Sequence, residues 1–79
     1  MRIAYLPLKV EVGAVERVAG RLMDIEEVTE VHSISGVYDI LAKVLVDDYD
    51  QFAEVMPEKI PGIPSIRETN TLLTFTAFK

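Results

Sequence analysis

Apolar and polar residues alternate strictly from Ile40 to Val46, which predicts a β-strand. One face of this strand carries Ile40, Ala42, Val44 and Val46, and the other carries Leu41, Lys43 and Leu45. The preceding segment, residues 31–35, has the composition of a second strand, and the glycine at position 36 favours a turn between the two. Residues 31–46 are therefore predicted to form a β-hairpin around which the rest of the chain is organised.

The segments on either side of the hairpin predict further strands and two helices. Apolar residues at i, i+3, i+4 and i+7 from Val15 form the stripe of an amphipathic helix. Asp48, followed by Gln51 three positions later, matches a capping box at the start of a second helix. The predicted elements are a strand at 3–12, a helix from 14 onward, a strand at 28–35, the strand that follows Asp39, a helix beginning at 48 and a strand at about 67–78.

Two prolines interrupt these patterns. Pro7 has no N–H to give to a sheet ladder, so we expect the first strand to lie at a sheet edge there, or to contain a bulge. Pro57 lies within the apolar stripe of the second helix. It is expected to kink that helix or to end its regular part near Met56, leaving a tighter last turn to Lys59.

The order of elements, β-α-β-β-α-β, predicts an α+β fold of the ferredoxin-like sandwich type, with a four-stranded antiparallel sheet and two helices on one face. Two helices cover only one side of such a sheet. The opposite side is expected to present an apolar set such as Ile3, Tyr5, Leu41, Leu45, Leu73 and Phe75. A surface of that size usually marks an interaction site, so we predict a two-fold dimer that packs sheet against sheet.

Composition narrows the possible functions. The 79 residues form one predicted domain, 1–79, which is small enough to gain stability from association. The chain has no cysteine and one histidine, so an ordinary zinc site is not expected, and no cofactor is predicted. A net charge of −5 argues against direct nucleic-acid binding. No apolar run is long enough to span a bilayer, and the sequence is expected to belong to a cytoplasmic protein.

The hairpin tip carries the residues with the clearest potential chemistry. Gly36 suits a positive φ or a close ligand approach, Tyr38 offers an amphipathic ring, and Asp39 offers a carboxylate. Together they would suit a small zwitterion, with Thr69 and Thr71 adding hydroxyl groups from the start of the last strand. The alternative is purely structural, with a turn glycine, an interface tyrosine, an exposed aspartate and threonines chosen for strand propensity.

The hairpin sequence VHSISGVYDILAKVLVDD, with IPGI at 60–63 and TNTLL at 69–73, resembles the ligand-binding domain of the Lrp/AsnC family of feast/famine regulators, also called the RAM domain. The resemblance implies a small-molecule effector, usually an amino acid. It implies that Ser35, Gly36, Val37, Tyr38, Asp39, Thr69 and Thr71 contact that effector. It also implies dimers that assemble further, often as four dimers in an octamer, in an equilibrium that the effector shifts.

Family members also carry an N-terminal helix-turn-helix domain, whereas this sequence begins at the first strand, so it resembles a stand-alone version of the module. The leading hypothesis is an amino-acid-binding module that oligomerises and modulates transcription indirectly, with full-length Lrp/AsnC-type regulators as candidate partners. One alternative is a small dimeric ferredoxin-like monooxygenase, which His32 inside a helix-sheet cavity would favour. Another is an oligomerisation module without an effector.

Overall fold

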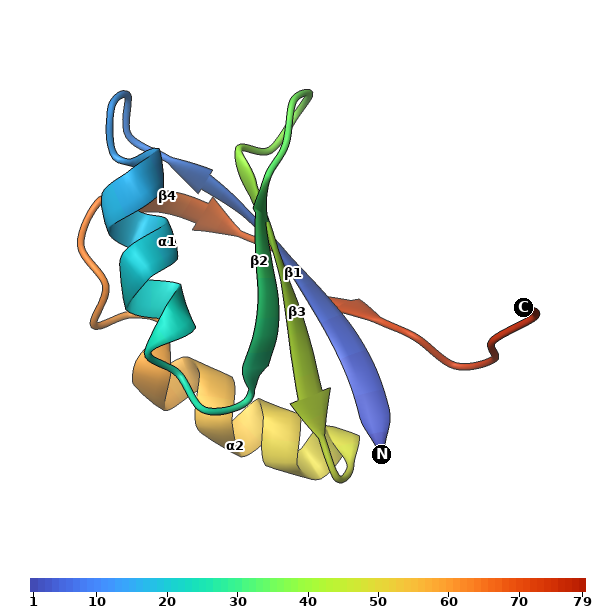
Figure 1. The fold of residues 1–79 in the computed structure, drawn as a ribbon. Helices are drawn as coiled ribbons and strands as arrows, with labels where there is room; N and C mark the ends of the chain where they lie inside the picture. Colours follow the sequence, from blue (N-terminus) through green and yellow to red (C-terminus); the bar gives the residue numbers. More distant parts are fainter.

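The computed structural model describes all 79 residues except for the side chain of Val55. The elements in chain order are β1 (Arg2–Val10), α1 (Val15–Met23), β2 (Val28–Ser33), β3 (Ile40–Val46), α2 (Tyr49–Lys59), β4 (Ile66–Thr69) and β5 (Leu72–Leu73) (Figure 1). The strands are antiparallel in the order β2-β3-β1-β4, and β5 also pairs with β1. This arrangement confirms the predicted ferredoxin-like fold, with the last strand divided into two short pieces.

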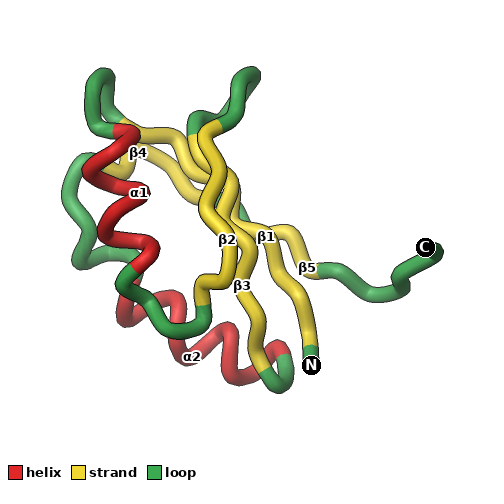
Figure 2. The backbone as a smooth tube through the Cα atoms, in the orientation of Figure 1, coloured by secondary structure: helices red, strands yellow, loops and turns green.

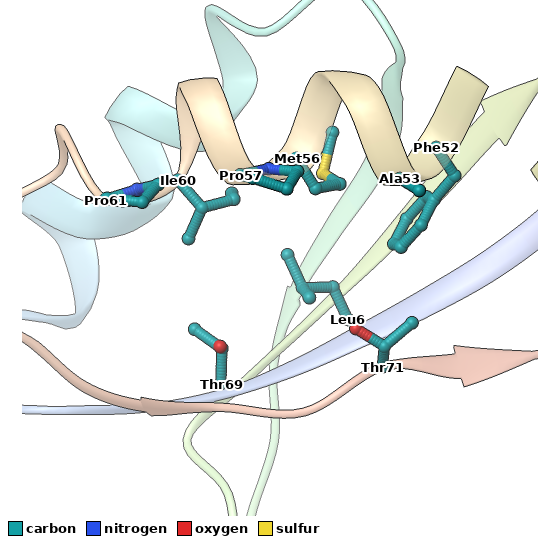
Figure 3. A pocket seen from close by; sticks show the side chains of 9 residues that line it. All are labelled: Leu6, Phe52, Ala53, Met56, Pro57, Ile60, Pro61, Thr69 and Thr71. Atoms are coloured by element: carbon teal, nitrogen blue, oxygen red, sulfur yellow. The ribbon is translucent and has the colours of Figure 1, made fainter. Parts of the chain in front are cut away.

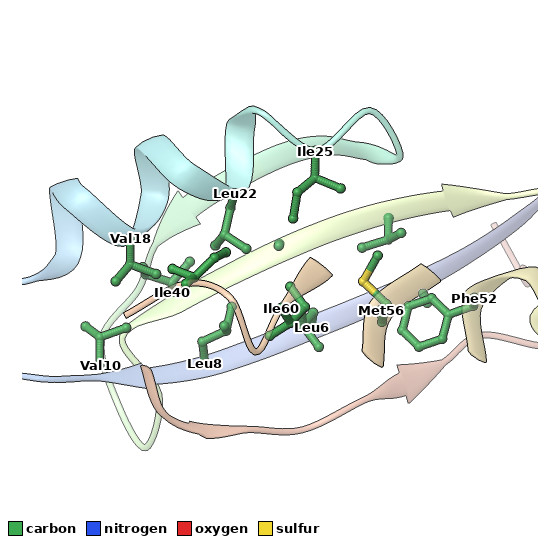
Figure 4. Close-up of a cluster of buried hydrophobic side chains, with 14 of the residues drawn as sticks. Leu6, Leu8, Val10, Val18, Leu22, Ile25, Ile40, Phe52, Met56 and Ile60 are labelled. Carbon is green, nitrogen blue, oxygen red and sulfur yellow. The ribbon is translucent and has the colours of Figure 1, made fainter. Parts of the chain in front are cut away.

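Both helices lie on one face of the sheet, and the hydrophobic core fills the space between the helices and the sheet (Figures 1 and 4). The strict alternation in β3 is confirmed, because Ile40, Ala42 and Val44 are completely buried. From α1, Val18 and Leu22 meet this layer, as the helical spacing predicted. Because this face of the sheet is buried, the register of each strand is fixed by the need to turn its apolar set of side chains toward the core.

Helix α2 begins as its sequence predicts. The carboxylate of Asp48 accepts a hydrogen bond from the backbone N–H of Gln51 at 2.8 Å, and the Gln51 side chain accepts one from the N–H of Asp47 at 2.7 Å. The expectation that Pro57 ends the regular helix near Met56 is wrong. The helix continues to Lys59, because Met56 and the residues of the next turn pack into the core and hold the α-helical geometry. Neither described helix is long and apolar enough to cross a membrane.

Pro7 does not lie at a sheet edge, because β1 is flanked by β3 on one side and by β4 and β5 on the other. The N–H of Asn70 donates to the Pro7 carbonyl, so the nitrogen of Pro7 faces the same neighbour without a hydrogen to donate. The last strand is interrupted at this point, between Thr69 and Leu72. The proline is therefore accommodated by a break in the adjacent strand, and the bulge in the β1–β4 pairing lies further along, between Lys9 and Val10.

Three strands are shorter than the sequence indicated. Strand β1 ends at Val10, and Val12 lies in the following turn, fully exposed. Strand β2 ends at Ser33, and β5 ends at Leu73. The chain after β5 projects away from the rest of the molecule (Figure 2). The last residue of this segment that hydrogen-bonds to β1 is Thr74, whose backbone N–H and hydroxyl both donate to the carbonyl of Ile3.

The face of the sheet opposite the helices carries several partly or fully exposed apolar side chains around Lys43. We call this surface the open face, and its apolar residues are Ile3, Tyr5, Leu41, Leu45 and Leu72. Leu73 and Phe75 were also expected there, and that prediction is wrong. Leu73 is the pairing partner of buried Ala4, and the Phe75 ring packs edge-on against Tyr49 of α2, with the ring centroids 6.2 Å apart.

Candidate functional site

The hairpin tip, residues 35–39, lies between β2 and β3 at one end of the sheet. Gly36 has a φ of +119°, a conformation that side-chain-bearing residues rarely adopt. Val37 is 71% exposed, and Ser35 is also exposed. The predicted loop is thus present, with its glycine in the conformation that the sequence analysis anticipated.

Asp39 has a structural partner. Its Oδ2 atom accepts a hydrogen bond from the backbone N–H of Val10 at 3.0 Å, and its own N–H donates to the carbonyl of Leu8 at 2.9 Å. The carboxylate thereby supplies an acceptor to β1 just beyond the last paired residues of the β1–β3 ladder. Asp39 consequently fixes the hairpin against β1, whatever else it binds.

Tyr38 connects the tip to the last strand. Its hydroxyl accepts a hydrogen bond from the side-chain Nδ2 of Asn70 at 3.4 Å, so the Tyr38 side chain reaches across β1 to the segment between β4 and β5. Thr69 pairs with Leu8 on the helix side, and alternation along the strand places Asn70 on the open face. Tyr38 and Asn70 therefore meet at the end of the open face.

Thr69, at the end of β4, and Thr71, in the break before β5, face the other side of the sheet from Asn70. Both line a groove of about 370 Å³ between α2 and the sheet, which we call the α2 groove (Figure 3). Its lining residues are Leu6, Phe52, Ala53, Met56, Pro57, Ile60, Pro61, Thr69 and Thr71. The structure thus brings the two threonines together, but it separates them from Tyr38 by the thickness of the sheet.

The α2 groove is apolar except for hydroxyl and backbone groups. Thr69 and Thr71 supply two hydroxyls on the sheet wall, and the lining residues include no charged side chain. In the opposite wall, Pro57 has no N–H, so the carbonyl of Ala53 lacks its regular helical donor. Sequence reasoning did not identify the helical lining residues, although a proline within an apolar helical stripe was a visible signal of unusual backbone there.

His32 lies outside any helix-sheet cavity. It is on the exposed side of β2, where its Nε2 atom lies 3.0 Å from Glu30, and Lys43 lies 3.1 Å from the other oxygen of that carboxylate. Hydrogen bonds from His32 and Lys43 lower the pKa of Glu30 below its usual range. The position that would have favoured a monooxygenase is therefore not observed. The described residues also contain no cluster of three metal-binding side chains.

Comparison with known proteins assigns the family. The family described as Lrp/AsnC ligand binding domain matches residues 3–79. A proline dehydrogenase transcriptional activator of Rhizobium radiobacter is 35% identical over 66 residues, which are 84% of this chain and 42% of the activator. The chain spans about half the length of the curated relatives that it matches.

Solved structures agree with this assignment. The protein TTHA0845 of Thermus thermophilus superposes with a TM-score of 0.92 at 26% identity, covering 100% of this chain and 99% of that one. A transcriptional regulator of Neisseria meningitidis, solved in complex with L-methionine, has the same fold, with a TM-score of 0.86 at 15% identity. That match covers 99% of this chain and 52% of the regulator. The resemblance seen in the sequence is confirmed, and the chain belongs to the family of Lrp/AsnC ligand-binding domains.

Proposed function

We propose that this domain binds an amino acid with an apolar side chain, and that binding changes how copies of the domain assemble. In this proposal the domain modulates transcription indirectly, through related regulators with which it co-assembles. Membership in a family of regulators supports the regulatory role. The net charge of −5 is unfavourable for direct contact with a phosphate backbone.

The observation that carries the proposal is the α2 groove with its two threonine hydroxyls. The walls formed by Leu6, Met56 and Ile60 suit a hydrocarbon side chain, because covering it removes apolar surface from water. Hydroxyl groups both donate and accept, so Thr69 and Thr71 suit the carboxylate and ammonium ends of an amino acid.

Further acceptor capacity comes from the carbonyl of Ala53 opposite the threonines, where Pro57 leaves it without its usual donor. The groove offers no charged partner for a charged side chain. Burying a charge without a partner is costly, so this groove favours leucine-like or methionine-like effectors over lysine or glutamate. The regulator of Neisseria meningitidis in complex with L-methionine supports an amino acid as the ligand class for this fold.

The hairpin tip joins this proposed site through Tyr38. The contact between Tyr38 and Asn70 fixes the segment that lies between the two threonines. A ligand that orders Thr69 and Thr71 would therefore also order the tip. The loop from Ser35 to Val37, exposed and rich in backbone N–H groups, is then placed to contact the effector or a neighbouring copy.

Self-association follows from the open face. Covering an apolar patch of roughly 300 Å² on each of two copies is worth about 15 kcal/mol before association costs of about 4–15 kcal/mol. Phe75 and Phe78, 80% and 97% exposed, add apolar surface on the projecting tail. We therefore infer a homodimer that packs open face to open face, and further assembly, such as an octamer, as the state on which the effector acts.

Calorimetric titration with the twenty amino acids tests effector binding. We expect heat with apolar amino acids and none with lysine or glutamate. Thr71→Val removes one groove hydroxyl at nearly constant volume and should weaken binding about tenfold, because a charged ligand group loses a hydrogen bond. The matched control is Thr76→Val in the exposed tail. If none of the twenty amino acids gives heat, or if Thr71→Val and Thr76→Val bind the amino acid with equal affinity, the proposed site is overturned.

Light scattering tests the open-face dimer separately. The native chain, 8.9 kDa as a monomer, is expected to scatter as a dimer or a larger assembly. Leu41→Lys places a charge on the open face and should shift the mass toward the monomer, since an unpaired charge in an interface is costly. Met23→Lys, at a 65% exposed position on α1, is the control. A native monomer, or an unchanged mass for Leu41→Lys, would contradict the dimer.

A further inference from the structure

The last five residues of the sequence, 75–79, have the composition of a strand but pair with no strand that the structure describes. We call this segment the tail. It reads FTAFK, and both phenylalanine and threonine are favoured in strands. Strand β1 begins at Arg2, and Thr74 already bonds to Ile3. The tail therefore begins where β1 has no further residues to pair with it.

The tail projects from the rest of the molecule and exposes two aromatic rings (Figures 1 and 2). Phe75 and Phe78 are 80% and 97% exposed. Between the tail and the start of β1 is a hollow of about 380 Å³, lined on the sheet side by Ile3 and Tyr5. These two residues belong to the open face, so the hollow continues the surface through which we infer the dimer. A second copy that covers the open face is therefore within reach of the tail.

Strand β2 offers a free edge. It pairs only with β3, so alternate N–H and C=O groups on its other side have no strand partner in the part of the chain that the structure describes. This edge is continuous over Val28–Ser33, whereas the opposite edge of the sheet is interrupted between Thr69 and Leu72. Glu30, the one charged residue of β2, is already ion-paired with Lys43 at 3.1 Å. Of the two edges, β2 is therefore better suited to receive an added strand.

The strand directions suit pairing between two copies. Strand β5 is antiparallel to β1, β1 to β3 and β3 to β2, so a tail that continues β5 runs opposite to β2. When two open faces pack about a two-fold axis parallel to the strands, strand directions are kept and the two edges of the sheet exchange sides. The tail of one copy then lies beside β2 of the other, in antiparallel orientation. The two-fold axis forms this contact twice, so both tails and both β2 edges are used.

We infer that in the dimer the tail of each copy pairs with the free edge of β2 in the partner, as an added antiparallel strand. This inference rests on the open-face dimer proposed above and adds a contact to it. Phe75 anchors the base of the tail on Tyr49 of α2, with the ring centroids 6.2 Å apart. Leu72 lies on the open face, and alternation along the strand turns Phe78 to the same side. The exposed Phe78 ring is thereby covered by the partner's sheet.

Introduced cysteines test this contact directly, because the native chain has none. The double variant Thr29→Cys/Thr76→Cys carries one thiol on β2 and one in the tail, and a bismaleimide with a short spacer links thiols that lie close together. We expect a covalent dimer in which peptide mapping finds β2 of one chain joined to the tail of the other. The matched control is Glu16→Cys/Thr76→Cys, with the first thiol at an exposed position of α1, and it should give little of this product.

A second test removes a backbone donor from the tail. The N–H of Thr74 points to β1, so in a continued strand the N–H of Ala77 points away from β1, toward the added partner. Ala77→Pro removes this N–H and should raise the dissociation constant of the dimer at least about tenfold, measured by sedimentation over a dilution series. Ala77→Thr keeps the N–H and should leave the constant unchanged. Equal constants for the two variants would contradict the strand pairing.

The results separate this inference from the dimer on which it rests. A native dimer that Leu41→Lys dissociates, but that gives no more β2–tail cross-link than the control, overturns the tail pairing and leaves the open-face dimer standing. A cross-linked dimer that persists in Leu41→Lys supports the tail pairing and overturns the open-face contact. A native monomer without the cross-link overturns both.

Discussion

Replacing Asp39 with alanine is expected to destabilise the fold even in the absence of any effector. The carboxylate accepts the backbone N–H of Val10, and Val10 is only 6% exposed. In Asp39→Ala this N–H loses its acceptor within a mostly buried strand, which costs about 1–3 kcal/mol. In Asp39→Asn the amide oxygen still accepts the bond, so most of that loss should be avoided. These losses are large compared with the roughly 5–15 kcal/mol that stabilises a typical domain.

Urea denaturation followed by circular dichroism measures these differences, with all variants at one protein concentration because association adds to apparent stability. Asp47→Ala is the control, since it removes the same charge from an exposed position. The expected order of stability is native and Asp47→Ala highest, Asp39→Asn slightly lower and Asp39→Ala lowest. An Asp39→Ala midpoint equal to the native one would refute the structural role of the carboxylate. An Asp39→Asn midpoint as low as that of Asp39→Ala would show that charge, and not the acceptor, matters.

Three further variants test other parts of the fold. Leu8→Ala removes a completely buried side chain and should cost about 2–5 kcal/mol in urea denaturation, whereas a loss below about 1 kcal/mol would contradict the packed core. Lys59 holds the pKa of Glu27 below its ordinary value of 4.5, so the pair stabilises the fold above that pH and the contribution is lost as the pH falls through the lowered pKa. Glu27→Gln should therefore be less stable than the native chain near pH 7, and the difference should shrink as the pH falls below 4.5; a pH-independent difference would contradict this coupling. Gly36→Ala should cost about 1–3 kcal/mol because φ is positive there, whereas Gly62→Ala, without a positive φ, should cost less, and equal costs would contradict the strain at Gly36.

The faces of β3 could be predicted from the sequence, but those of the last strand could not. In β3 only one of the two alternating sets is uniformly apolar, so the buried face is unambiguous. In the last strand both sets contain large apolar residues, with Leu72 in one and Leu73 in the other. Only the pairing of Leu73 with Ala4 and of Leu72 with Tyr5 decides which residue reaches the open face.

The two prolines show a similar limit. The sequence correctly indicated that Pro7 disturbs a sheet ladder, but the disturbance appears in the neighbouring strand, and pairing between distant segments is not visible in a local pattern. Pro57 was expected to end the regular helix because of its missing N–H. The buried side chains of Met56 and Ile60 on either side of it hold that turn against the core, and packing outweighs the lost hydrogen bond.

The candidate site was only partly predictable, because contacts between distant segments are not visible in a local sequence pattern. The sequence and its family resemblance singled out Thr69 and Thr71, and both line the α2 groove. Their partners in that groove, such as Leu6 and Met56, come from β1 and α2 and have ordinary core residue types, so no local signal distinguishes them. The seven predicted contact residues remain a prediction, with the structure dividing them between the hairpin tip and the α2 groove.

The most direct test of the proposed function is to locate a bound amino acid on the ¹⁵N-labelled native chain. Titration with L-leucine or L-methionine is predicted to give saturable shifts centred on Leu6, Met56, Thr69 and Thr71, with weaker shifts at Tyr38 through its contact with Asn70. The absence of saturable shifts with any of the twenty amino acids would contradict the account. Shifts that leave the α2 groove untouched would contradict it equally.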